Sequence, residues 1–130
     1  MNYLLYDVFN MEKIWPSLVH LEDHVDRDTC DAILQECAKL VEQEIAGISR
    51  NGDEEGVTFD NGQVTTATGY KEAFQKYVEG GWSALGGDVA YGGMGMPKMI
   101  TAFHEEMLCS ADISFSLYPG LSAGAALSIA

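Results

Sequence analysis

Apolar residues recur every three or four positions along one segment of this sequence, and charged or polar residues fill most positions between them. That spacing places the apolar side chains on one face of an α-helix. The apolar positions are Ile33, Cys37, Leu40, Val41, Ile45 and Ile48. Asp28 or Thr29 stands where a side chain can cap the first turn. The pattern therefore predicts an amphipathic helix of about five turns.

The segments that flank this helix predict further helices. Residues 3–15 carry several apolar side chains and end at Pro16, which favours a short helix. Thr68 can cap another short helix, which ends at Gly80–Gly81. The apolar stripe of this second helix consists of Tyr70, Phe74, Tyr77 and Val78.

Residues 49–68 lie between these helices and are rich in glycine, asparagine and acidic residues, as loops are. Within them, the short apolar runs 57–59 and 64–66 flank Asp60–Asn61–Gly62. An Asn-Gly pair favours the tight turn of a β-hairpin. We expect a short hairpin over residues 57–66, of a kind that is marginally stable by itself.

The C-terminal third predicts two more helices. Pro97 suits the first turn of one of them, whose buried face consists of Met99, Ile100, Phe103 and Met107. Asp112 or Ser114 begins the other, and Tyr118–Pro119–Gly120 breaks or kinks it. With the earlier segments this makes about five helices, so the predicted fold class is all-α, a helical bundle.

The balance of charge excludes some partners. The chain has 20 acidic residues against 7 Lys and Arg, a net charge of −13. Such a surface repels phosphate backbones and anionic lipids, so neither nucleic acid nor a membrane surface is an expected partner.

No apolar run reaches the roughly 18 residues of a membrane span, and no basic residue precedes Lys13 as in a signal peptide. An odd number of cysteines without a Cys-x-x-Cys motif favours reduced thiols and a cytoplasmic protein: Cys30, Cys37 and Cys109.

The last ten residues, 121–130, are all apolar, Ser or Gly. A helix that is apolar on every side belongs in the interior of a larger protein. The segment also lacks the basic residues that often lie in the last turn of a helix. We therefore expect that the chain is the truncated first part of a longer protein.

One stretch carries a family resemblance. Residues 80–97 read Gly-Gly-Trp-Ser-Ala-Leu-Gly-Gly-Asp-Val-Ala-Tyr-Gly-Gly-Met-Gly-Met-Pro. This stretch resembles the signature of the acyl-CoA dehydrogenase family: a helix end, a Gly-Trp-x-x-Leu step, then Tyr-Gly-Gly-x-Gly before the next helix. Residues 104–107 and 111–121 are similar to the two helices that follow. The family usually has Pro or Glu just before Tyr-Gly-Gly, where this chain has Val89 and Ala90, a change that leaves the glycine turn intact.

Other segments are similar to one branch of that family. They are residues 51–56, residues 68–74 and the Leu-Tyr-Pro-Gly-Leu of residues 117–121. The branch is the one that includes the 3-methylmercaptopropionyl-CoA dehydrogenases. The resemblance thus covers most of the chain, in the order that the family has.

The resemblance implies that residues 1–130 are the N-terminal helical domain of an FAD-dependent acyl-CoA dehydrogenase, an oxidoreductase of fatty acid metabolism. Such a flavoprotein oxidises an acyl-CoA thioester to the 2,3-enoyl-CoA: a carboxylate takes the α proton, and the flavin accepts the β hydride. In the family that carboxylate and most flavin contacts belong to a middle β domain and a C-terminal helical domain. Both are expected beyond residue 130, so no catalytic residue is expected here and this segment alone is predicted to be inactive.

The resemblance also implies partners and a place for the substrate. The partners are an electron-transfer flavoprotein or similar acceptor, and further copies of the full-length chain in a homo-oligomer. The N-terminal helices of the family form one wall of the acyl pocket. We expect the substrate-contacting residues at the predicted helix break: Tyr118, Gly120, Leu121 and Ser122. Close helix packing is an equally good interpretation, because pockets and cores use the same small and apolar side chains.

Several other residues invite a functional interpretation. Gly93-Met94-Gly95 could cradle a phosphate, but Lys98 stands where a third glycine belongs, which favours a simple turn. His20 and His24 share a helical spacing that suits zinc, but a zincin has Glu where this chain has Leu21, so no metal is predicted.

His104-Glu105-Glu106 could act as acid and base, but the spacing favours the polar side of a helix. Cys109 lies five residues from His104, on a different helix face, and so is not expected to be a nucleophile beside its base. Cys30 and Cys37 are expected to be small buried hydrophobes.

A different class of protein fits the composition as well. An acidic helical module without enzyme activity could use its apolar tail to dock a partner protein. Composition and periodicity do not decide between this module and the enzyme domain, and the family resemblance favours the enzyme.

Overall fold

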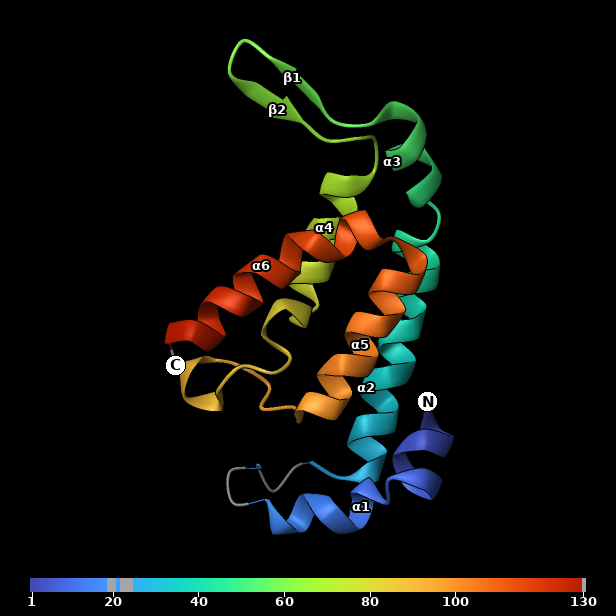
Figure 1. Ribbon diagram of the computed structural model, residues 1–130, viewed down its shortest axis with the longest axis vertical. Coiled ribbons are helices and arrows are strands. Elements are labelled where there is room, and N and C mark those ends of the chain that lie inside the picture. The colour runs from blue at the N-terminus through green and yellow to red at the C-terminus, as the bar shows by residue number, and fades with distance from the viewer. Residues whose placement is uncertain (19–20, 22–24, 130) are drawn as a thin grey trace.

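The computed structural model describes residues 1–18, 21 and 25–129. In this part of the chain the architecture is helical, with one hairpin projecting from the helical body (Figure 1). The α-helices are α1 (Met11–Ile14), α2 (Arg27–Leu40), α3 (Ser49–Glu55), α4 (Tyr70–Glu79), α5 (Lys98–Ala111) and α6 (Ile113–Ile129). The shorter helical turns are η1 (Tyr3–Val8), η2 (Trp15–Ser17), η3 (Val41–Ile45), η4 (Trp82–Ala84) and η5 (Val89–Tyr91). Helices α2 and α5 run side by side in the same direction, and α6 crosses over α4.

The predicted amphipathic helix is present as α2 and its continuation η3. Its buried side chains are Cys30, Leu34, Cys37, Val41 and Ile45. The cap is not Asp28 or Thr29, as predicted, but Asp26, whose carboxylate accepts a 2.8 Å hydrogen bond from the backbone N–H of Thr29. The helix therefore begins at Arg27, two residues earlier than a cap at Asp28 would place it, and Asp28 lies inside its first turn.

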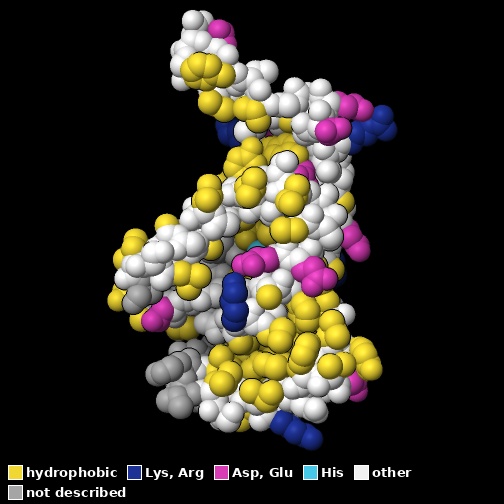
Figure 2. Space-filling view, in the orientation of Figure 1, with side chains coloured by type: hydrophobic (Ala, Val, Ile, Leu, Met, Phe, Trp, Pro, Cys, Tyr) yellow, Lys and Arg dark blue, Asp and Glu magenta, His cyan; other side chains and the backbone are white. Residues whose placement is uncertain are grey.

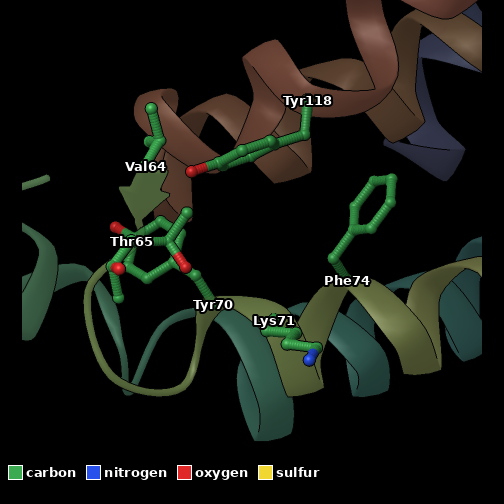
Figure 3. A pocket seen from close by; sticks show the side chains of 7 residues that line it. Val64, Thr65, Tyr70, Lys71, Phe74 and Tyr118 are labelled. Carbon is green, nitrogen blue, oxygen red and sulfur yellow. The ribbon is translucent and has the colours of Figure 1, made fainter. Parts of the chain in front are cut away.

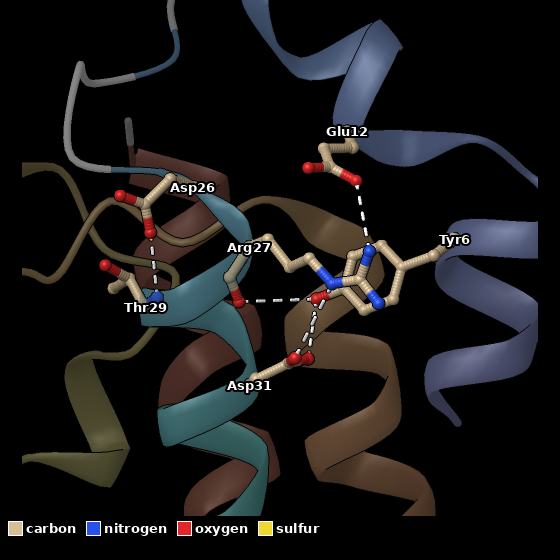
Figure 4. Close-up of polar contacts among 6 residues, drawn as sticks. All are labelled: Tyr6, Glu12, Asp26, Arg27, Thr29 and Asp31. Atoms are coloured by element: carbon tan, nitrogen blue, oxygen red, sulfur yellow. Dashed lines mark hydrogen bonds and ion pairs between the residues drawn. The ribbon is translucent and has the colours of Figure 1, made fainter.

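The N-terminal segment is not the single helix that was predicted for residues 3–15. Asn10 adopts the left-handed conformation (φ 51°) and separates η1 from α1, while Pro16 lies inside η2. Tyr6 attaches this segment to α2, since its hydroxyl donates a 2.7 Å hydrogen bond to Asp31 (Figure 4). The guanidinium of Arg27 lies 4.1 Å from the centre of the Tyr6 ring and pairs with Glu12 at 3.4 Å.

Two clusters of buried side chains form the core. One joins the N-terminal segment to α2, α5 and the glycine-rich loop: Leu5, Tyr6, Trp15, Cys30, Leu34, Leu85, Met96, Ile100 and Phe103. The other lies between α2, η3, α4, α5 and α6: Cys37, Val41, Ile45, Ala67, Tyr70, Ala73, Tyr77, Leu108 and Phe115. Trp82 and Met107 contact both clusters and make the interior continuous.

The predicted hairpin is confirmed. Its strands β1 (Thr58–Asp60) and β2 (Gln63–Thr65) pair antiparallel, with Phe59 opposite Val64. Asn61 and Gly62 both have positive φ (46° and 82°), as a tight hairpin turn requires. All strand residues are exposed. The segment before the hairpin, expected to be loop, contains the short helix α3 instead.

The ends of α4 and α6 differ from the sequence prediction in three ways. Thr68 does not cap α4, because Gly69 holds that position and the N–H of Thr68 donates to Glu55 at 2.8 Å. Val78 is 47% exposed, and Ala73 is buried in the stripe of α4 instead. Helix α6 passes through Pro119 without a break, although proline cannot donate to the carbonyl four residues earlier. Pro119 and Phe115 are both buried, so packing at this turn offsets the missing hydrogen bond.

A buried carboxylate fixes the corner between α5 and α6. As predicted, Asp112 begins α6, and its Oδ1 accepts a 3.0 Å hydrogen bond from the N–H of Phe115. Its other oxygen accepts a hydrogen bond from the hydroxyl of Tyr70 in α4. Gly52 of α3 lies against that hydroxyl so closely that a Cβ there would be 2.0 Å from it. Helices α3 and α4 and the α5–α6 corner therefore meet at one hydrogen bond.

We predict that Gly52→Ala destabilises the protein by about 1–3 kcal/mol, because the added methyl displaces the buried Tyr70 ring and breaks its bond to Asp112. The free energy of unfolding in urea measures this. Gly47→Ala is the matched control, since a Cβ there meets nothing within 4 Å. Equal stability of the two variants would show that Tyr70 is not held at this corner.

Candidate functional site

The glycine-rich stretch of residues 80–97 folds into a tight loop between α4 and α5. The N–H groups of its Gly93-Met94-Gly95 all donate inward, to the carbonyls of Asp88, Ala84 and Gly87 respectively, at 2.9 Å each. A Cβ on Gly93 would lie 2.1 Å from the carbonyl oxygen of Gly87. These amides are therefore unavailable to a phosphate, and the interpretation of this motif as a turn is confirmed.

The loop places Trp82 against a buried histidine of α5. The Trp82 and His104 rings stack with centroids 5.7 Å apart and planes 3° from parallel, and Tyr77 lies 5.7 Å away on α4. His104 is only 4% exposed, and its Nε2 has no hydrogen-bond partner among the described residues. Burial lowers the pKa of His104 to about 4, against a weaker opposing effect of Glu105.

The prediction that His104 lies on the polar side of its helix is wrong, whereas Glu105 and Glu106 are exposed as predicted. His104 follows Ile100 by four residues and so shares its buried face of α5. The aromatic neighbours that make this burial possible come from α4 and η4, which a helical period within α5 does not reveal.

The cysteines occupy two environments. Cys30 and Cys37 are fully buried, as predicted, and burial raises the pKa of their thiols to about 12 and about 11. Cys109 is exposed, with its sulfur 3.4 Å from the hydroxyl of Ser116. It does not contact His104, which faces the interior.

The metal hypothesis falls outside the described residues, because His20 and His24 are not among them. Residues 1–18, 21 and 25–129 contain no group of three or more His, Cys, Asp or Glu side chains that could hold a metal ion. Among these same residues, no helix combines the length and the apolar character that crossing a membrane requires.

The four predicted substrate-contacting residues lie within two turns of α6 and are all exposed, Tyr118 by 39%. The Tyr118 ring packs against Tyr70, Phe74 and Phe115, with centroids 5.9–6.2 Å apart. Gly120, Leu121 and Ser122 are exposed, and Leu121 is 77% exposed.

Close helix packing, the other interpretation of the small residues of α6, does not occur among the described residues. A Cβ on either Gly120 or Gly124 would meet nothing within 4 Å. Every described residue of α6 from Gly120 onward is exposed.

A groove of about 440 Å³ lies beside Tyr118, between α6, α4 and the hairpin (Figure 3). Its lining residues are Val64, Thr65, Thr66, Tyr70, Lys71, Phe74 and Tyr118. Tyr118 extends from α6 with its hydroxyl toward Val64, while Phe74 rises from α4. Sequence reasoning assigned Tyr70 and Phe74 to the core and missed this groove, because only the fold brings β2 and α6 to the same place.

Comparison with known proteins places the chain in a family. Residues 27–130 match the acyl-CoA dehydrogenase N-terminal domain, and the chain belongs to this family. It is similar to 3-methylmercaptopropionyl-CoA dehydrogenase of Ruegeria pomeroyi, with 40% identity over 119 residues that cover 88% of this chain and 20% of that protein. It is also similar to broad-specificity linear acyl-CoA dehydrogenase FadE5 of Mycobacterium tuberculosis, with 33% identity over 120 residues that cover 89% of this chain and 19% of that protein.

The chain thus spans about a fifth of the length of these relatives. The family, the branch and the all-α fold class with one short hairpin, all predicted from sequence, are confirmed.

We predict that Ellman's reagent modifies one thiol of the native protein rapidly and the other two only after unfolding. Cys109 is exposed, whereas Cys30 and Cys37 are buried and their raised pKa values leave almost no thiolate at pH 8. Cys109→Ser should abolish the rapid phase. A rapid phase that remains in this variant would contradict the burial of the other two.

We predict that His104 makes the protein less stable as pH falls from about 6.5 toward 4. Its folded pKa of about 4 lies below the ordinary 6.5, so the unfolded chain binds a proton in this window and the folded protein does not. The loss between pH 7 and 4.5 should be about 2 kcal/mol greater in the wild type than in His104→Phe, which keeps an aromatic ring but does not titrate. Urea unfolding at both pH values measures it, and equal losses in the two proteins would show that His104 titrates normally.

Proposed function

We propose that this chain is the N-terminal helical domain of a longer, FAD-dependent acyl-CoA dehydrogenase, which oxidises an acyl-CoA thioester to the 2,3-enoyl-CoA. Family membership and the printed names of both relatives support the proposal. The middle β domain and the C-terminal helical domain, with the carboxylate that takes the α proton, follow in the same polypeptide. The full-length enzyme forms a homo-oligomer in the cytoplasm and passes electrons to an electron-transfer flavoprotein or similar acceptor.

The observation that carries this proposal is the exposure of α6. From Gly120 to Ile129 the helix has no charged residue, yet every residue is exposed, with Leu127 71% and Ile129 87% exposed. Hydrophobic side chains also lie along α6 in the space-filling view (Figure 2). An apolar helix surface of this kind is covered in a working protein. We assign the acyl chain and the following domains as its cover.

In this proposal the predicted residues of α6 have separate roles. Gly120, Leu121 and Ser122 contact the acyl chain: Gly120 and Ser122 are small and leave room beside the helix, and Leu121 offers an exposed apolar side chain. Tyr118 lies at the same end of α6 and borders the substrate wall on the side of α4.

The described residues do not by themselves fit a flavin. Two hollows among them, of about 440 and 270 Å³, are open to solvent. The amides of the glycine-rich loop already bond within the loop, and five of the seven Lys and Arg side chains form ion pairs with acidic residues: Arg27, Lys39, Arg50, Lys76 and Lys98. FAD, which accepts the hydride when bound, and the phosphates of coenzyme A are therefore assigned to contacts in the other domains. This domain supplies a wall that orients the acyl chain and excludes water from it.

We predict that Ser122→Phe in the full-length enzyme lowers kcat/KM for long acyl-CoA substrates and spares short ones. A pocket that rejects one extra methylene discriminates by roughly 1–3 kcal/mol, or about 10–200-fold in kcat/KM. A series of acyl-CoA chain lengths, assayed with an artificial electron acceptor, measures the effect.

Ser128→Phe is the matched control. Ser128 is exposed on the same helix, but six residues further on, so its side chain points in another direction. A uniform fall in kcat/KM at every chain length, or the same profile in both variants, would remove Ser122 from the substrate wall. An enzyme without activity toward any acyl-CoA would refute the function itself.

A further inference from the structure

The hairpin has one apolar face that nothing among the described residues covers. Phe59 and Val64 are direct cross-strand partners, so their side chains share a face, and Val57 lies two residues before Phe59 on the same side. These three side chains are 64–73% exposed. Two strands with an open apolar face are marginally stable in water, and a third element against that face would stabilise them.

This apolar face is continuous with the groove at the foot of the hairpin. Val64 belongs to both, and beyond it the groove wall consists of Tyr70 and Phe74 from α4 and Tyr118 from α6 (Figure 3). The combined surface, which we call the hairpin groove, consists of Val57, Phe59, Val64, Tyr70, Lys71, Phe74 and Tyr118. It runs from the exposed apolar side chains of the hairpin to the aromatic side chains of α4 and α6.

A lysine without an ion pair lies in the hairpin groove. Lys71 lines it and forms no ion pair with any described residue, although acidic residues outnumber Lys and Arg by 20 to 7. Lys76, one turn further along the same helix, pairs with Glu44 at 2.6 Å. The groove therefore offers a cation to a carboxylate from outside these residues. A second copy of this domain fits less well, because two surfaces of net charge −13 repel each other.

We propose that the hairpin groove binds an extended apolar segment that carries a carboxylate and belongs to the same polypeptide, after residue 130. This docking requires the longer enzyme and therefore rests on the function proposed above. The relatives are about five times as long as the part that this chain matches, so they contain ample sequence for such a segment. Apolar side chains of the segment cover Phe59 and Val64, and its carboxylate pairs with Lys71. The contact holds the hairpin against the rest of the enzyme.

Photochemical cross-linking in the full-length enzyme tests the docking. Benzoylphenylalanine in place of Phe59, followed by irradiation, digestion and mass spectrometry, should give a cross-link within one chain to a peptide that follows residue 130 and contains Asp or Glu. The same probe in place of Phe9 is the control, since Phe9 is also exposed but directly follows η1, in the N-terminal segment that packs against α2 and α5. It should not reach the same peptide. A cross-link between two chains would assign the hairpin groove to a second copy, and no cross-link would leave it solvent-facing; either result overturns the proposal.

A charge variant tests the role of Lys71. Lys71→Glu should lose most of the cross-link at position 59, whereas Lys71→Arg should retain it, because only the reversal removes the pairing with a carboxylate. Equal yields from the two variants would remove Lys71 from the contact.

Activity of the unmodified enzyme separates the two proposals. Oxidation of acyl-CoA without the cross-link refutes only the docking. The cross-link without any oxidation of acyl-CoA refutes only the function.

Discussion

The hydrogen bond between Tyr70 and Asp112 joins α4 to the α5–α6 corner, although the two residues are 42 positions apart in the sequence. Asp112 both caps α6 and accepts from Tyr70, so the same carboxylate sets where α6 begins and where α4 lies beneath it. The pair is buried, where an unpartnered carboxylate would be costly, and burial with the hydrogen bond to Asp112 raises the pKa of Tyr70. The direction of α6, the groove beside Tyr118 and the foot of the hairpin all follow from this one corner.

Helix α6 has buried apolar residues near this corner and only exposed ones further along the helix. Directly after the corner, the first turns of α6 are held by Phe115, whose ring lies 6.0–6.4 Å from those of Tyr70, Phe74, Tyr77 and Tyr118. Further along, the ten residues from Gly120 to Ile129 have no partner in the described part of the chain that would bury them. Helix α6 is thus packed against the core at its N-terminal end and exposed to solvent at its C-terminal end. A wall for a ligand needs this combination, because an unanchored helix would not hold the shape of a pocket.

Local patterns in the sequence predicted most elements, and the misses share one physical cause. The long helix, the hairpin turn at Asn61–Gly62 and the start of α6 at Asp112 each depend on residues a few positions apart. The burial of His104 and the continuation of α6 through Pro119 depend on partners elsewhere in the chain. The same holds for the residues that line the groove. Tyr118 was selected from the sequence because it is adjacent to a proline-glycine pair. Nothing adjacent to Lys71 or Val64 in the sequence indicates that they line a groove. Only packing shows that they share a groove with Tyr118.

Tyr118 lies where the two exposed apolar surfaces, α6 and the hairpin groove, meet. It projects from α6 toward α4 and β2 and lines the hairpin groove, while Leu121, one turn further along α6, is 77% exposed. The rings of Phe74 and Phe115 pack against Tyr118, with centroids 5.9 and 6.1 Å away. The exposed part of α6 and the hairpin groove therefore border on one aromatic ring. In the enzyme proposed above, a segment seated in the groove would cover Tyr118 beside the helix to which we assign the acyl chain.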